Sequence, residues 1–221
     1  MSIAFGIVLS GICRYIVSER VSGLKHLQVI SGMHLKAYWA GSFMFDFLKL
    51  LVSVITAIIL FAAFDLELND TMAVLVLLPF GVIMFTYATS YIFSTESAAS
   101  SITIFIHICI LGILSAVTFS FRIAIPSLMK DGDTMHAWFK LVPTYLVGSA
   151  MYCDRQCDTL SDVRKAPFVD AAETSPDKWA FENMTTDLLL LIVHFFGWIL
   201  VIMVIEKGWM NFMRCRMSAP V

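Results

Sequence analysis

Ionisable residues stand inside several apolar segments of this sequence, where a charge could carry chemistry. Asp46 and Lys49 lie three positions apart on one face of a long apolar stretch, and His107 stands alone in another. Charge inside a membrane span is costly and normally faces a partner or water. We interpret Asp46 and Lys49 as a local ion pair, with a contact to the amphipathic helix described below or a translocation path as alternatives. We expect His107 to bond to a neighbouring helix rather than to a metal ion.

The sequence contains no recognisable catalytic or metal-binding arrangement. It has no GxxxxGK[ST] phosphate loop and no HExxH motif, and its five histidines are scattered over different segments. Its five cysteines form no paired CxxC units, which argues against structural zinc. We therefore expect no catalytic residue, no metal ion and no cofactor within this chain.

The composition is that of a membrane protein. Of the 221 residues, 59% are hydrophobic and 14% are charged, whereas soluble domains average about a quarter charged. The net charge of −2 and the lack of a basic patch argue against nucleic acid as a partner. We expect an integral, multi-pass membrane protein, in the plasma membrane or an internal membrane.

Apolar runs predict about five transmembrane helices. They cover approximately 1–15, 35–64, 71–93, 101–121 and 187–205. The first run is shorter than the ~20 residues that cross a bilayer, so we interpret it as a span begun partway along. Basic residues between 14 and 36, and again after 206, place both segments in the cytoplasm.

By parity of the spans, the long polar region 122–183 is then extracellular. Within it, 137–152 is apolar but short and interrupted by Lys140 and Pro143, which predicts a re-entrant or interfacial helix pair. Cys153 and Cys157 follow, and on this side they could form a disulfide with each other or with a missing part of the protein, or remain free thiols. Two glycosylation sequons begin at Asn69 and Asn183, the first in a loop that we expect to be too short for use.

The segment from 17 to 46 combines an amphipathic pattern with the start of a span. An apolar stripe recurs at helical spacing in Val17, Val21, Leu24 and Leu27. Glu19 and His26 project from the opposite side, Arg20 sits at the stripe's edge with its head reaching water, and a glycine at Ser31-Gly32 ends the helix. We predict a helix over 17–32 on a membrane face, folding back into the next span.

This segment resembles the signature of A-subfamily ABC transporters. The resemblance rests on Glu19-Arg20, Lys25-His26-Leu27-Gln28, Ser31-Gly32, Tyr38-Trp39 and Asp46. It implies an all-α permease domain of ABC exporter type, in which 17–32 is a coupling helix resting on a nucleotide-binding domain. The residues implied at that interface are Glu19, Arg20, Lys25, His26 and Gln28.

The same resemblance implies ATP and Mg²⁺ bound by nucleotide-binding domains elsewhere, a second permease half as partner, and membrane lipids or sterols as substrates. The chain would comprise the last five spans of a six-span half, as a fragment, a truncated gene model or one piece of a split protein. A channel or secondary transporter, and an inactive membrane anchor, are the alternatives. A channel would need ionisable residues along a midplane path, and few are available.

Overall fold

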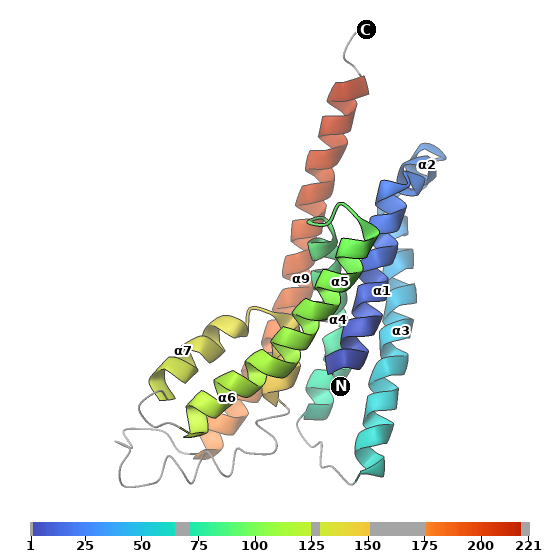
Figure 1. The fold of residues 1–221 in the computed structure, drawn as a ribbon. Helices are drawn as coiled ribbons and strands as arrows, with labels where there is room; N and C mark the ends of the chain where they lie inside the picture. The colour runs from blue at the N-terminus through green and yellow to red at the C-terminus, as the bar shows by residue number, and fades with distance from the viewer. Residues whose placement is uncertain (1, 65–70, 125–128, 151–175, 218–221) are drawn as a thin grey trace.

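The protein is all-helical over the residues that this computed structural model describes, which are 2–64, 71–124, 129–150 and 176–217 (Figure 1). The elements are α1 (Ser2–Val21), α2 (Leu24–Ile30), α3 (Leu35–Ala63), α4 (Thr71–Ser90), α5 (Glu96–His107), the π-helix η1 (Ile108–Leu114), α6 (Ser115–Ala124), α7 (Met129–Phe139) and α9 (Pro176–Met217). Residues 143–150 are also helical. The predicted fold class is confirmed.

Four helical segments are long and apolar enough to cross a membrane. They are Leu35–Ala63, Met72–Ser90, Glu96–Phe121 and Thr186–Gly208, and they match four of the five predicted spans. The fifth predicted span, 1–15, forms most of α1, which is not among these four. The C-terminal part of α1 carries Arg14, Glu19 and Arg20, so charged residues appear where the apolar run ends.

Helix α4 occupies the centre of the bundle. It contacts α1, α3 and α9, and α1 in turn lies along α5. Leu75, Leu78 and Ile83 of α4 are fully buried, and at Gly81 a side chain would touch Leu191 of α9 at 3.4 Å. Helix α9 therefore packs directly against this position of α4, and a side chain here would be in van der Waals contact with it.

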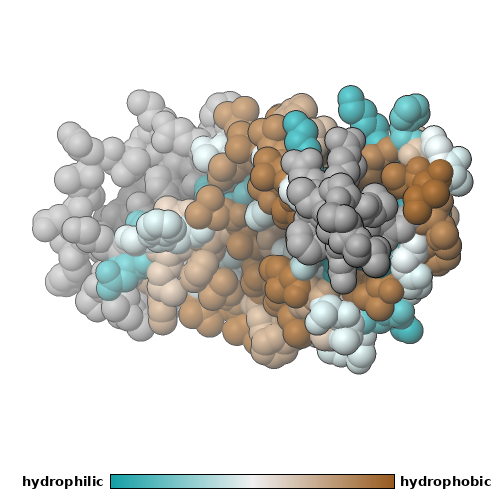
Figure 2. Space-filling model, turned by 90° about the horizontal axis from the view of Figure 1, so that it is seen from above, coloured by the Kyte–Doolittle hydropathy of each residue, from teal (hydrophilic) through white to brown (hydrophobic). Residues whose placement is uncertain are grey.

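The outward surface of the bundle is apolar. Hydrophobic residues make up much of the coloured surface in Figure 2, and α3 and α9 expose residues such as Phe45, Val52, Phe196 and Val204. A soluble protein rarely exposes continuous apolar faces of this kind. The surface supports the prediction of an integral, multi-pass membrane protein.

The described parts of the predicted inner and outer segments lie at opposite ends of the bundle. Helix α2 and the C-terminal turns of α9 are at one end, and α7 is near the other (Figure 1). The predicted helix pair begins earlier than expected, because α7 starts at Met129, and its second helix begins at Pro143. Proline lacks an N–H donor and suits the first helical position, which explains the break there.

Candidate functional site

The predicted helix over 17–32 is divided into two helices. Helix α1 continues to Val21, and Gly23 then adopts a left-handed conformation with φ 75° before α2 begins. Gly32 has φ 96° and ends α2, which confirms the predicted stop at Ser31-Gly32. The prediction of one continuous helix was wrong, since only a residue without a side chain adopts this turn readily. Gly23 is the residue in the sequence that could have indicated this break.

Glu19 is buried rather than exposed to water. Its side chain accepts a hydrogen bond from the Tyr15 hydroxyl at 2.7 Å and another from the Tyr38 hydroxyl at 2.5 Å. The prediction that Glu19 projects from an outward polar face was therefore wrong. Two phenol donors satisfy the carboxylate, so its burial carries no unmet hydrogen bond.

Arg20 also points into the bundle. Its guanidinium donates to the carbonyl of Ser90 at 3.0 Å and to that of Phe93, and it lies 5.4 Å from the ring centre of Tyr91. The last carbonyls of a helix have no partner within the helix, so Arg20 caps the end of α4. The residue stays partly exposed, and the sequence had not indicated these carbonyl partners.

Lys25 and Glu206 form a buried ion pair between α2 and α9. The Lys25 ammonium contacts Glu206 Oε1, which also accepts from the Tyr91 hydroxyl. The ammonium lies 4.6 Å from the ring centre of Trp39, a cation–π distance. Burial lowers the pKa of Lys25, an effect opposed by its bond to Glu206. Glu206 was not predicted, because its partner is distant in sequence.

The residues predicted inside the spans have the partners expected of them. Lys49 donates to Asp46 at 2.9 Å, which confirms the local pair, and the Tyr87 hydroxyl donates to the other carboxylate oxygen at 2.7 Å. His107 Nδ1 lies 3.0 Å from the Thr144 hydroxyl. His107 is thus hydrogen-bonded to a neighbouring helix, as predicted. Over the described residues, no group of side chains could hold a metal ion.

A second buried cluster lies at the far end of α9. Lys140, which follows α7, pairs with Asp187 at 2.8 Å, and Ser149 donates to the same carboxylate at 3.2 Å. The Lys140 carbonyl lies 3.1 Å from His194 Nε2. These contacts fasten the helix pair to α9. The sequence indicated Lys140 only as an interruption of an apolar run.

Several predicted site residues cannot be placed. Cys153, Cys157 and Asn69 lie outside the described residues. Asn183 belongs to the first turns of α9, and His26 belongs to α2, but their side chains are outside what the structure describes. The proposed disulfide and both glycosylation sites stay predictions.

Helix α2 turns its apolar side outward. Leu24, Leu27 and Ile30 are exposed, Ile30 by 80%, and Gln28 is half-buried. We call these three residues the exposed face of α2. The polar residues of this segment instead bond to α3, to α9 and to the turn after α4. The segment therefore links three parts of the bundle and leaves an apolar surface at its end.

Sequence comparison identifies the family of this chain. The model of the ABC-2 family transporter protein matches residues 1–204. The chain belongs to the ABC-2 transporter family. It forms a transmembrane part of an ABC transporter, and its relatives include members of sub-family A.

Three relatives illustrate the similarity. The phospholipid-transporting ATPase ABCA3 of Rattus norvegicus is 29% identical over 61% of this chain. The ATP-binding cassette sub-family A member 7 of Rattus norvegicus is 26% identical over 79%. The retinal-specific phospholipid-transporting ATPase ABCA4 of Bos taurus is 25% identical over 87%. The matched regions cover only 8%, 8% and 9% of these proteins, so the chain spans less than a tenth of their length.

Proposed function

We propose that this chain serves an ATP-driven lipid transporter, in which α2 couples ATP hydrolysis to movement of the bundle. Two of the relatives are named as phospholipid-transporting ATPases, which supports a lipid substrate. ATP and Mg²⁺ would bind to nucleotide-binding domains elsewhere, and a second permease half would complete the transporter. The observation that carries the coupling role is the position of α2, exposed on one side and anchored on the other.

The exposed face of α2 offers the contact with a nucleotide-binding domain. Leu24, Leu27 and Ile30 are apolar and accessible at one end of the bundle, where a partner domain would bury them. The burial of Glu19 and Lys25, and the bonds of Arg20 to carbonyls near the end of α4, do not fit the earlier expectation that these residues make this contact. Instead, these three residues connect the helix to the membrane part.

Force on α2 would reach three helices. The Lys25–Glu206 ion pair connects α2 to α9. The hydrogen bond from Tyr38 to Glu19 connects α3 to the end of α1, which precedes α2. A conformational change requires that the two states differ in contact energy with the partner. A domain that moves on binding ATP would supply that difference at the exposed face of α2.

The test is a charge placed on this face in the complete transporter. Leu27→Asp should reduce lipid-stimulated ATPase activity and lipid movement at least tenfold, because burying an unpaired carboxylate at an interface costs more than the ~1.4 kcal/mol that a factor of ten represents. Basal ATPase activity and membrane insertion should persist. Ile92→Asp is the matched control, since Ile92 is also apolar, 78% exposed and close to the end of α4. Equal loss in both variants, or no loss in either, would contradict a coupling role for α2.

A further inference from the structure

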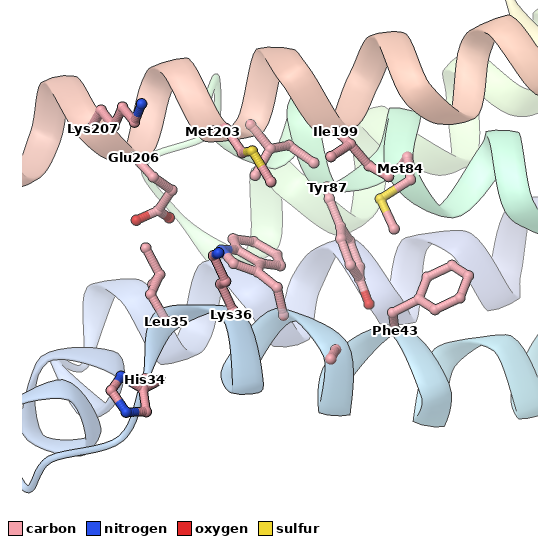
Figure 3. Close-up of a pocket in the computed structure, with 13 residues that line it drawn as sticks. His34, Leu35, Lys36, Phe43, Met84, Tyr87, Ile199, Met203, Glu206 and Lys207 are labelled. Atoms are coloured by element: carbon pink, nitrogen blue, oxygen red, sulfur yellow. The ribbon is translucent and has the colours of Figure 1, made fainter.

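A cavity of about 700 Å³ lies between α3, α4 and α9. Its walls are largely apolar and include Phe43, Met84, Ile199 and Met203. Figure 3 shows Glu206 pointing from α9 toward α3 at one end, with Lys207 beside it on α9 and Lys36 on α3, while Phe43 and Met84 lie at the other end. This size and polarity match sites that hold small amphiphilic ligands.

Two buried polar atoms at the charged end have no hydrogen-bond partner within the described part of the protein. They are Oε2 of Glu206 and Nε1 of Trp39, and both residues line the cavity. The Glu206 side chain is only 4% exposed. Both residues contact the same Lys25 ammonium, so the unpaired acceptor and the unpaired donor are near each other. Buried groups of this kind are normally satisfied, and they point to a ligand that both donates and accepts.

The charge at this end favours an anion. Lys36 and Lys207 line the cavity, and Glu206, its only acidic lining residue among those described, is already paired with Lys25. A phosphate between the two lysines would balance their charge. Basic pockets between membrane helices at the cytoplasmic side bind phospholipid head groups in this way.

We propose that this cavity binds one anionic phospholipid of the inner leaflet as a resident ligand. Its phosphate lies between Lys36 and Lys207 and accepts from Trp39, and a head-group amine or hydroxyl donates to Glu206 Oε2. Its acyl chains lie along the apolar wall and leave toward the membrane past Met44 and Leu200, which are exposed. The inner-leaflet placement rests on the predicted orientation of the chain.

The position of this site suggests what the lipid does. Glu206 joins the cavity to the Lys25 pair that anchors α2, so a bound head group strengthens the α2–α9 contact. Lipid at this site therefore stabilises the link without itself being carried across. A rise from Lys36 to Phe43 covers about 10 Å of helix, which is deep enough for a head group and the first part of its chains.

Binding can be measured without ATP, so the outcome is independent of the coupling role. The protein would be placed in phosphatidylcholine nanodiscs with a small amount of photoactivatable phosphatidylserine, and labelling would be competed with unlabelled phosphatidylserine, phosphatidylethanolamine or phosphatidylcholine. We expect competition to be strongest for phosphatidylserine, weaker for phosphatidylethanolamine and weakest for phosphatidylcholine, which lacks both the net charge and the N–H donor. Cross-links should map to α3 and α9.

Two pairs of variants separate the head-group contact from the acyl contact. Lys36→Gln combined with Lys207→Gln should weaken binding roughly thirty-fold, whereas Arg14→Gln, an exposed basic residue outside the cavity, should leave it unchanged. Met203→Trp should fill the cavity and reduce labelling at least tenfold. Val204→Trp should not, because Val204 is the next residue of α9, is 70% exposed and does not line the cavity.

Three outcomes would overturn the proposal. Equal competition by phosphatidylserine and phosphatidylcholine would show no selectivity for the head group. Equal loss in the lysine and Arg14 variants would indicate only general surface charge. Loss in the lysine variant with full binding in Met203→Trp, or displacement by inorganic phosphate, would indicate a free phosphate site instead of a lipid site.

Discussion

At the scale of single residues, Lys25 and Glu206 determine how α2 is held. Both side chains are almost fully buried, 6% and 4% exposed, so each charge depends on the other. Removing one partner of a buried pair leaves an uncompensated charge, whereas replacing both with apolar residues of similar size is often tolerated.

We therefore expect Glu206→Leu to destabilise the protein by about 3–5 kcal/mol. The double variant Lys25→Met with Glu206→Leu should recover most of this loss. Unfolding of the reconstituted protein in denaturant would measure both. The control is Glu96→Leu, which removes an acid that is 42% exposed and lies 3.6 Å from Arg14. If the double variant is as unstable as the single one, the pair does not account for the burial of Lys25.

The sequence predicted one kind of polar contact and missed another. Asp46 and Lys49 were paired correctly because they lie three positions apart on one helix. Glu206 lies 181 positions from Lys25, so spacing gives no information about that pair. Glu19 and Arg20 were placed in water because their segment is amphipathic, but here tyrosine hydroxyls and helix-end carbonyls supply the partners and the apolar side faces outward.

At the scale of elements, the turn at Gly23 sets the direction of α2. Its φ of 75° lies in the left-handed region, which costs a residue with a side chain roughly 1–2 kcal/mol. No atom outside its immediate neighbours lies within 4 Å of the position that a side chain would take. Any effect of a substitution there would therefore come from the backbone and not from a collision.

We predict that Gly23→Ala lowers the free energy of unfolding by about 1–2 kcal/mol. Gly11→Ala should instead raise it by roughly 0.5–1 kcal/mol, because Gly11 is inside α1, also has open space around it, and alanine favours a helix. Thermal or denaturant unfolding of the two variants in parallel would measure the contrast. A stabilising Gly23→Ala would mean that α1 and α2 can form one continuous helix.

Long apolar helices could be predicted, and their internal irregularities could not. The runs at 35–64 and 101–121 correspond to α3 and to the segment from α5 to α6. Within the 101–121 run, Ile108–Leu114 forms a π-helix, which no periodicity in the sequence predicted. An apolar pattern indicates that a span exists, whereas the hydrogen-bond register inside it depends on packing against neighbouring helices.

At the scale of the whole molecule, α9 is fastened at both ends of its membrane segment. Asp187 pairs with Lys140 at one end and Glu206 pairs with Lys25 at the other. A helix between these two positions is about 28 Å long, close to the ~30 Å of a hydrocarbon core. Both buried pairs therefore lie near the membrane boundaries, and α9 connects α2 on one side to the helix pair on the other.

This arrangement makes the orientation of the chain testable at two exposed positions. Leu27 of α2 is 63% exposed and Trp138 of α7 is 68% exposed. The basic residues between 14 and 36 favour the cytoplasm for the first, whereas the parity of the spans and the sequons favour the extracellular side for the second. In a background without the five native cysteines, Trp138→Cys should react with a membrane-impermeant maleimide in intact cells. Leu27→Cys should react only after permeabilisation, and Leu50→Cys, fully buried in α3, should react in neither condition.

The reverse labelling pattern would invert the topology, and the inner leaflet could then not be the source of the proposed lipid. Labelling of both positions in intact cells would show that the two ends of α9 do not lie on opposite sides of a membrane.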